Sequence, residues 1–376
     1  MIITDNERIS PVLPEAPLLT GDTDITRKKK KAVPAMAAAI MFIISIAVHL
    51  AIITEGVHRL KTEGSGALFS SVIPDYEISE PLVPTLPEGS SVENDGEKDK
   101  PSTSEPYIKS SDLSTKAEYG LALSNETSYS PDLFALLGAD RPSSTEDETD
   151  RQYGKDSPKV LIYHTHATEG YRDSAGTGFR TSDEDKSVIS VGKTICLVLE
   201  KAGIEAIHVT EQFDRENWSA SYDNSTEAVR KIMKKYPSIQ YVFDIHRDCI
   251  GNETDGYIRA TAPLYGRDTA QLMFVCGTDE GGSSHTEWRQ NLTFAVQLQS
   301  MLCERHEGLM RAVNLRRASF YQDTSPSSLI LECGTCAGTL TEAKRAAVLF
   351  AVCLADYIKG YDCGLDCEEL IKTLCP

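Results

Sequence analysis

Positive charge is scarce in this chain of 376 residues, which has 38 Lys and Arg side chains against 56 Asp and Glu. The formal net charge of −18 argues against a nucleic-acid partner, because proteins that bind nucleic acid gather basic residues on one face. The one strongly basic cluster, Arg27–Lys31, is short and stands directly before an apolar run. We therefore predict no nucleic-acid partner.

Cysteine is absent from the first 195 residues, and all ten cysteines lie in the carboxyl-terminal half. That half has enough apolar sequence to build its own core, so we expect it to fold without depending on disulfides. Cys333 and Cys336 form a C-x-x-C pair, which we expect to be bridged or packed as thiols rather than a redox centre. A serine-hydrolase motif is also missing, since Ser325 lacks the surroundings G-x-S-x-G.

Long apolar runs are missing too, with one exception at Ala32–Ile53. This run has no formally charged side chain and is long enough for one transmembrane helix, which needs roughly 20 residues. A cleaved signal peptide is the alternative, but the run begins late and its clearest small-residue triplet lies at its start. The basic cluster before it places residues 1–31 in the cytoplasm and everything after Ile53 outside it.

The remaining sequence divides into a polar segment and a globular one. Residues 54–156 are dominated by Pro, Ser, Thr, Glu and Asp, a composition that predicts a mostly disordered tether. Within it, Pro131–Gly138 has the pattern of a short helix that docks on the domain or on a partner. Residues 157–376 alternate strand-like and helix-like patterns and end in a cysteine-rich tail. We predict an α/β domain with an open, largely parallel sheet and helices on both faces.

Two histidine motifs follow apolar strand patterns, HTHATE at His164–Glu169 and DIHRD at Asp244–Asp248. In open α/β sheets, binding and catalytic groups collect at the carboxyl ends of the strands. His166, Glu169 and His246 are imidazole and carboxylate ligands of the kind that catalytic Zn²⁺ uses, with water in the fourth position. His164 remains an alternative to His166 as the ligand, and Glu184 remains an alternative to Glu169.

A hydrolase also needs a general base that moves the proton of the water to the leaving nitrogen. Glu332 is the candidate, because it ends the apolar strand SLILE, where a carboxylate is costly to bury without a partner or a role. Asp244 is expected to orient His246 or to bond to the strand end. Arg247 is expected to hold a substrate carboxylate or to pair with Asp248. Other histidines, His208, His285 and His306, are expected at the surface.

Several motifs together resemble the stage II sporulation protein P family, from about Lys159 to Lys359. They are VLIYHTHATEGY, VISVGKTICLVLEKAGI, YPSIQYVFDIHRD, MFVCGT followed by WRQNL, and FYQDTSPSSLILECGT. The resemblance implies a fold similar to zinc N-acetylmuramoyl-L-alanine amidases. By motif position, it also places the family's metal-binding and catalytic residues on His166, His246 and Glu332. The third ligand in amidases of this fold usually lies at the start of the following helix, nearer Glu184.

The resemblance further implies a membrane-anchored zinc amidase and endopeptidase that cleaves peptidoglycan while the forespore is engulfed. Its expected partners are the sporulation proteins D and M, and its expected place is the mother-cell side of the engulfment septum. Two alternatives come from other classes: a non-catalytic, membrane-tethered peptidoglycan-binding or scaffold protein, and a zinc carboxypeptidase-type enzyme. An intact set of His166, His246 and Glu332 argues against the scaffold.

Overall fold

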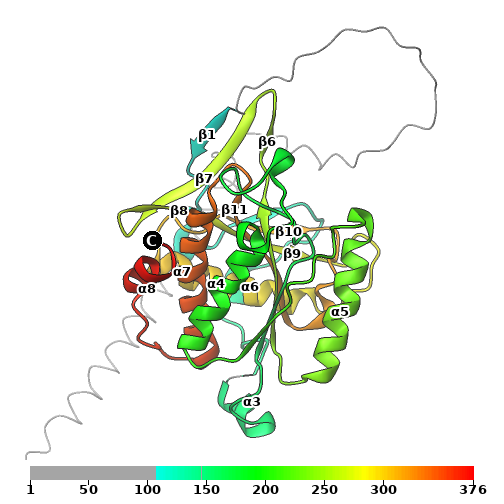
Figure 1. Ribbon diagram of the computed structural model, residues 1–376. Coiled ribbons are helices and arrows are strands. Elements are labelled where there is room, and N and C mark those ends of the chain that lie inside the picture. Colours follow the sequence, from blue (N-terminus) through cyan, green and yellow to red (C-terminus); the bar gives the residue numbers. More distant parts are fainter. Residues whose placement is uncertain (1–106, 145) are drawn as a thin grey trace, which may run out of the picture. The chain divides into compact units, whose positions relative to one another are not determined.

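The computed structural model describes residues 107–144 and 146–376, and its main element is a seven-stranded sheet (Figure 1). The strands lie in the order β2 (Leu123–Asn125), β10 (Val313–Arg316), β9 (Leu272–Gly277), β11 (Ser327–Thr335), β5 (Tyr241–Asp248), β3 (Val160–Tyr163) and β4 (Ala206–His208). Neighbouring strands are parallel except β9 and β11, which are antiparallel. The predicted α/β class is confirmed, with a sheet that is mixed rather than purely parallel.

Helices cover both faces of this sheet, as the alternating pattern predicted. One face packs against α4 (Val188–Lys201), α6 (Trp288–Arg305) and α7 (Leu340–Lys359), and their apolar side chains form the largest core cluster. The other face packs against α5 (Ser221–Lys235), which joins Leu161 and Val242 in a smaller cluster. Figure 1 shows α5 on the opposite side of the strands from α4 and α7.

Local signals set the ends of the helices that frame the site. Ser187 accepts a hydrogen bond from the Ile189 N–H and caps the start of α4, directly after the loop that carries His166 and Glu169. Thr339 and Glu342 form a capping box at the start of α7. Gly360, with φ of 76°, ends α7 in the left-handed conformation that glycine adopts without strain.

Side-chain alternation along the two central strands determines which face carries the polar groups. On β5, Phe243 and Ile245 point into the large core, so Asp244 and His246 lie on the opposite face. On β11, Leu329 and Leu331 belong to the same core, which puts Glu332 on the face of His246. The polar groups therefore lie on the α5 side of the sheet, near the carboxyl ends of β5 and β11.

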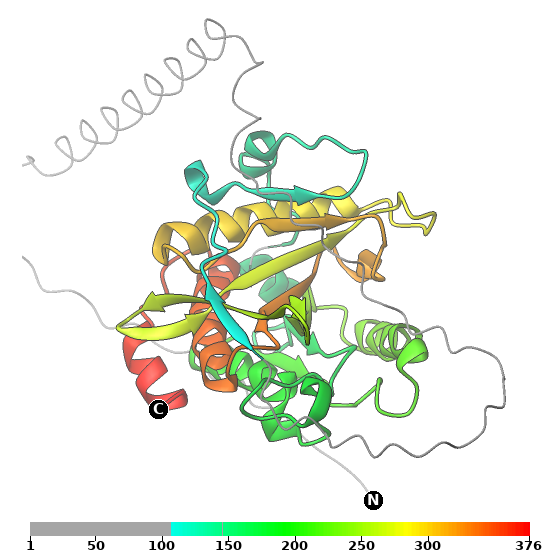
Figure 2. The same ribbon diagram turned by 90° about the horizontal axis from the view of Figure 1, so that it is seen from above.

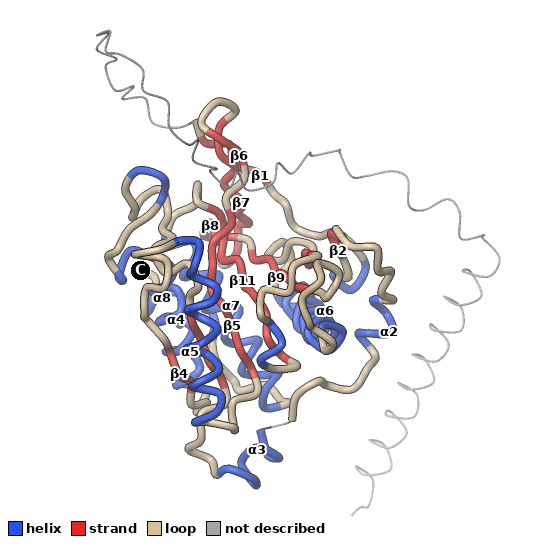
Figure 3. The backbone as a smooth tube through the Cα atoms, turned by 90° about the vertical axis from the view of Figure 1, so that its right-hand side faces the viewer, coloured by secondary structure: helices blue, strands red, loops and turns tan. Residues whose placement is uncertain are grey.

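A second, smaller sheet is formed mainly by the segment between β5 and β9. This segment supplies β6 (Gly251–Asn252), β7 (Gly256–Leu264) and β8 (Arg267–Ala270), and β1 (Ile108–Ser111), from the start of the described chain, pairs with β7 in parallel. Figure 3 shows it extending from the end of the main sheet where β5 and β11 finish. A disulfide between Cys249 and Cys336 joins the chain just after β5 to the chain just after β11, across 87 residues.

Much of the predicted tether is ordered. Besides β1 and β2, residues 107–156 form the helices α2 (Leu133–Leu137) and α3 (Glu146–Tyr153), so the expectation of disorder is wrong for this part. In Figure 2, the segment that holds β2 and α2 lies alongside α6. The docking helix predicted in Pro131–Gly138 is confirmed, because the leucines of α2 pack against the core and Gln297 of α6 bonds to Ala139 O.

The polar contacts of this segment explain why a sequence poor in apolar residues is nevertheless held in place. Arg141 donates to the carbonyl of Tyr357, and Ser143 bonds to Ser327 at 2.7 Å. In α3, Asp150 pairs at 2.8 Å with Lys159, a buried lysine at the start of β3. Amino-acid composition cannot predict such long-range contacts.

No helix in the described ranges is long and apolar enough to cross a membrane. The predicted anchor, residues 32–53, and the predicted cytoplasmic segment, residues 1–31, lie outside the residues that the structure describes. The first part of the predicted tether, residues 54–106, lies outside them as well.

Candidate active site

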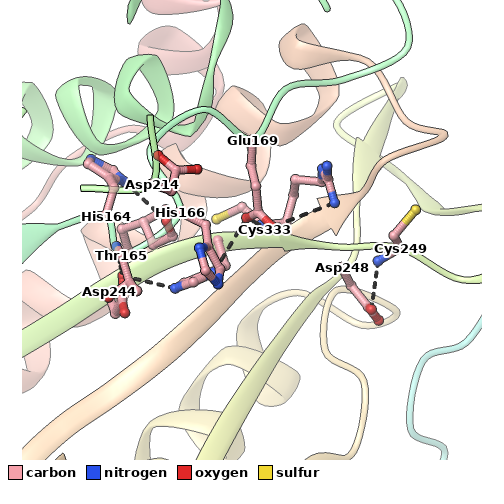
Figure 4. Close-up of polar contacts among 12 residues, drawn as sticks. His164, Thr165, His166, Glu169, Asp214, Asp244, Asp248, Cys249 and Cys333 are labelled. Atoms are coloured by element: carbon pink, nitrogen blue, oxygen red, sulfur yellow. Dashed lines mark hydrogen bonds and ion pairs between the residues drawn. The ribbon is translucent and has the colours of Figure 1, made fainter. Parts of the chain in front are cut away.

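The structure gathers the predicted site residues at the carboxyl ends of three neighbouring strands, β3, β5 and β11. Figure 4 shows His166 and Glu169 of this group, with Asp244 nearby. His166 and Glu169 stand in the loop after β3, and His246 lies near the end of β5. Glu332 is the register partner of His246 in the parallel pair of β11 and β5, so the two side chains leave the sheet side by side. Three segments distant in sequence thus supply one polar cluster.

His246 is the centre of this cluster. Its Nδ1 lies 3.4 Å from Glu169 Oε2, and its Nε2 lies 2.9 Å from Asp244 Oδ1. The ring of His166 stands nearly perpendicular to it, with 5.3 Å between the ring centroids. His166 Nδ1 faces Ser221 Oγ at 3.4 Å. All three predicted ligands are therefore neighbours, and each is almost fully buried.

The protonation of the cluster follows from burial and from its two carboxylates. Burial lowers the pKa of His166 to about 3, with a further contribution from His246, so this imidazole is neutral. Burial raises the pKa of Glu169, but Arg247 and His246 outweigh it and hold the value at about 2. Burial lowers the pKa of His246, yet Asp244 and Glu169 raise it well above its usual range. The two carboxylates therefore favour a positive charge at the position of the His246 ring.

The donor set suits a zinc ion, because two imidazoles and one carboxylate are a usual set of catalytic zinc ligands. Within residues 107–144 and 146–376, however, no three His, Cys, Asp or Glu side chains are arranged to hold a metal as they stand. The contacts give the reason, since both nitrogens of His246 face carboxylates and the Nδ1 of His166 faces a hydroxyl. An ion would replace the proton of His246 and turn these side chains toward itself.

Glu332 is a half-buried side chain with the properties expected of a chemically active carboxyl group. Its Oε2 is buried and makes no hydrogen bond within the described chain. Burial, with a contribution from Asp248, raises its pKa to about 8. A carboxyl group with a pKa near the working pH can both accept and return a proton. Asp248 is itself held by Arg311 at 2.8 Å.

His164 points away from this cluster, which separates it from His166. Its Nδ1 bonds to the carbonyl of Ile245 at 3.1 Å, and its Nε2 lies 2.9 Å from Nε2 of His208. The pair packs against Gly192 of α4, where a Cβ atom would lie 2.8 Å from both rings. His164 thus ties β3 to β5 behind the site, and the structure places His166 beside His246.

The two alternative carboxylates also separate clearly. Glu184 lies on the short 3-10 helix Glu184–Lys186 and is exposed, whereas Glu169 lies against His246. Asp244 matches the orienting position predicted for it, because it contacts His246 and also accepts a hydrogen bond from the Thr165 N–H at 2.8 Å. Such outer partners orient metal-binding histidines.

Of the two roles predicted for Arg247, the pairing with Asp248 is wrong. Its Nε donates to the carbonyl of Gly170, its Nη2 donates to the carbonyl of Phe179, and its backbone N–H donates to Glu169. Asp248 pairs with Arg311 instead. Arg247 is buried and fixes the loop that carries the ligands. Its spacing in DIHRD gave no sign of this, because its partners, two backbone carbonyls and the Glu169 carboxylate at 3.6 Å from Nη1, come from a distant segment.

The structure corrects the predictions for three other histidines and for the C-x-x-C cysteines. His285 and His306 are buried, and His208 is half-buried, so none of the three is a surface residue. Cys336 forms its disulfide with Cys249, while Cys333 is a free, buried thiol. Side-chain packing, rather than a motif around each residue, decides these outcomes.

Sequence reasoning missed an aromatic and charged group beside His166. Trp218, on the 3-10 helix Trp218–Ala220, stacks on the His166 ring with a centroid distance of 3.5 Å. The guanidinium carbon of Arg180 lies 3.8 Å from the Trp218 ring. Arg180 pairs with Asp214, whose side chain is fully buried. An exposed tryptophan in a polar loop was the one available signal.

Comparisons with known proteins bear on the family that these motifs suggested. The sequence model of stage II sporulation protein P matches residues 77–355. Stage II sporulation protein P of Bacillus subtilis (strain 168) is 27% identical over 211 residues, which are 52% of this chain. The matched region spans 50% of that relative's own length, so the chain covers about half of the curated relative.

Solved structures of amidases are also similar. The N-acetylmuramoyl-L-alanine amidase AmiC2 of Nostoc punctiforme matches with a TM-score of 0.33 and 17% identity, covering 54% of this chain and 97% of that one. The N-acetylmuramoyl-L-alanine amidase from Clostridium difficile 630 matches with a TM-score of 0.32 and 15% identity, covering 55% of this chain and 94% of that one.

Proposed function

Because the chain belongs to the stage II sporulation protein P family, we propose that it is a zinc-dependent peptidoglycan hydrolase that acts in sporulation. The proposed reaction is cleavage of the amide between the glycan's lactyl group and the stem peptide, together with endopeptidase cleavage of cross-links. The observation that carries the proposal is the convergence of His166, Glu169 and His246 with Glu332, whose Oε2 is buried and makes no hydrogen bond to a described residue. A scaffold would gain nothing from burying that carboxyl group.

His166, Glu169 and His246 would hold the ion, and Asp244 would orient His246. When bound, Zn²⁺ would lower the pKa of a water ligand and polarise the scissile carbonyl. Glu332 would take the proton from the attacking water and return it to the leaving nitrogen, for which its pKa of about 8 is suited. Arg247 would keep the loop of Glu169 in place throughout.

The membrane anchor at residues 32–53, the outward-facing domain and the location at the engulfment septum are parts of the same proposal. The sporulation proteins D and M are the proposed partners. These elements rest on the sequence pattern and on the family. The Cys249–Cys336 disulfide supports an outward-facing domain, because disulfides persist in oxidising compartments.

The test combines metal analysis with turnover on purified peptidoglycan. Wild-type protein should carry about one zinc per chain and release peptides, and a chelator should stop the release until Zn²⁺ is returned. Glu332→Gln should keep the zinc and lose at least about 100-fold in turnover, the size typical of general acid–base catalysis. His246→Ala should lose both the zinc and the turnover. Wild-type protein that binds peptidoglycan but never cleaves it would favour the scaffold instead.

A further inference from the structure

A pocket of about 410 Å³ opens next to the proposed metal ligands. Its lining includes Thr168, Arg180, Asp214, Arg215 and Trp218. Two connections join it to the catalytic cluster. Trp218 stacks directly on His166, and Arg180 is the backbone bridge partner of Glu169. Whatever fills the pocket therefore touches two residues that are themselves in contact with proposed ligands of the ion.

The pocket is built around a fixed arginine. The fully buried carboxylate of Asp214 accepts hydrogen bonds from the N–H and the hydroxyl of Thr168 and pairs with Arg180 at 3.1 Å. Trp218 holds the flat side of the guanidinium. The side chain of Arg180 still keeps 37% of its surface exposed. Its hydrogen bonds to described residues leave from Nη1 alone, so Nε and Nη2 remain free to donate.

Such a guanidinium matches one chemical class of ligand. Its two free donors form a fork that binds a carboxylate through two parallel hydrogen bonds. Arg215, which is exposed on the same wall, adds a second positive charge. The indole of Trp218, 45% exposed, offers an apolar surface beside the fork. A small organic molecule that carries a carboxylate fits these two positive charges and the indole surface better than a neutral sugar does.

We propose that this pocket binds a free carboxylate of the stem peptide and that Arg180 selects substrates that carry it. The inference rests on the proposed function, because it assigns the pocket to the leaving side of the same amide bond. Trp218 is the positioning residue that couples the pocket to His166. Substrates whose carboxylate is converted to a carboxamide lose the charge and one acceptor, and they are bound less tightly.

The test compares two synthetic muramoyl-peptides that differ only in a carboxylate or a carboxamide on the second residue of the peptide. With the full chain, kcat/KM should be about 10-fold higher for the carboxylate compound, as expected for one charge-assisted pair. Arg180→Gln should remove this preference by raising KM for the carboxylate compound about 10-fold more than KM for the carboxamide compound. Arg180→Lys should restore part of the preference. Arg230→Gln, an exposed arginine on α5, is the matched control.

Binding without turnover keeps the two proposals apart. The chain has two tryptophans, and Trp288 is buried, so fluorescence quenching by a ligand reports mainly on Trp218. In the Glu332→Gln background, the carboxylate compound should quench at about 10-fold lower concentration than the carboxamide. Carboxylate-selective quenching with no cleavage by wild-type protein would reject the proposed function and keep the pocket. Cleavage without selectivity, or an equal kcat loss on both compounds in Arg180→Gln, would reject the pocket.

Discussion

A single carboxyl group links chemistry to stability in this protein. Glu332 is half-buried, its Oε2 is buried without a hydrogen bond to a described residue, and burial raises its pKa in the folded chain to about 8, well above the usual carboxyl value. Between these values the unfolded chain is ionised while the folded chain keeps its proton, so the folded state binds more protons. Stability must therefore fall as the pH rises through this window. The fold is more stable when Glu332 is protonated than when it is ionised.

This linkage predicts a stabilising substitution. In metal-free protein, Glu332→Gln should gain on the order of 2–4 kcal/mol in free energy of unfolding relative to wild type between pH 5 and pH 8. Below about pH 4.5 the two proteins should differ little, because both carry a neutral side chain. Denaturant unfolding at several pH values measures the difference. Glu304→Gln, at an exposed position of α6, is the control and should show no such trend. A wild type that gains stability toward pH 8 contradicts the prediction.

At the residue scale, strand ends and residue types suffice to suggest His166, Glu169, His246 and Glu332 as site residues. They do not distinguish His164 from His166, since both lie within three residues of the end of the same strand. Their separation depends on His208 and the space left by Gly192, which come from other elements. Arg180 was missed for the same reason, because its partners are set by loop conformation.

At the scale of elements, the Cys249–Cys336 disulfide joins the ends of the two strands that carry His246 and Glu332. It also closes the segment that contains β6, β7 and β8 of the small sheet together with β9, α6, β10 and β11. Replacing both cysteines by serine should lower the free energy of unfolding by about 2–4 kcal/mol, the usual contribution of a bridge across a long loop. A reductant should lower the thermal midpoint of wild type and leave the double variant unchanged. Cys196→Ser, at a free cysteine of α4, is the control. Equal midpoints for wild type and the double variant would show that the bridge does not stabilise the fold.

Elements with strong periodicity were predictable, and elements held by pairing were not. The buried strands β3, β5 and β11 and the helices α4 and α7 follow from apolar runs bounded by caps. The strands β1 and β2 have no such pattern, because each is an edge strand of four residues or fewer that depends on a partner distant in sequence. The antiparallel pairing of β9 with β11 was likewise unpredictable, since a mixed sheet has the same local sequence signals as a parallel one.

The whole molecule has a longer folding unit than its composition suggests. The polar segment before β3 pairs with the small sheet through β1, extends the main sheet through β2 and covers α6 with α2. Leu121 in this segment is buried in the large core, and Arg141 and Ser143 reach partners near the end of α7 and at β11. A domain cut at Ser157 would expose the surfaces that these residues cover.

A truncation series therefore tests the domain boundary. A fragment of residues 107–376 should unfold at a higher denaturant concentration than a fragment of residues 157–376. The expected difference is at least about 2 kcal/mol, the value for burying one leucine side chain. Leu121→Ala in the longer fragment should reproduce part of this loss, because a cavity replaces a buried side chain. Leu133→Ala, at a partly buried position of α2, should cost less. Equal stability of the two fragments would mean that residues 107–156 only rest on a domain that is complete without them. The shorter fragment should also be less active than the longer one, because a loosened β10 and β11 would disturb Arg311, Asp248 and Glu332 together.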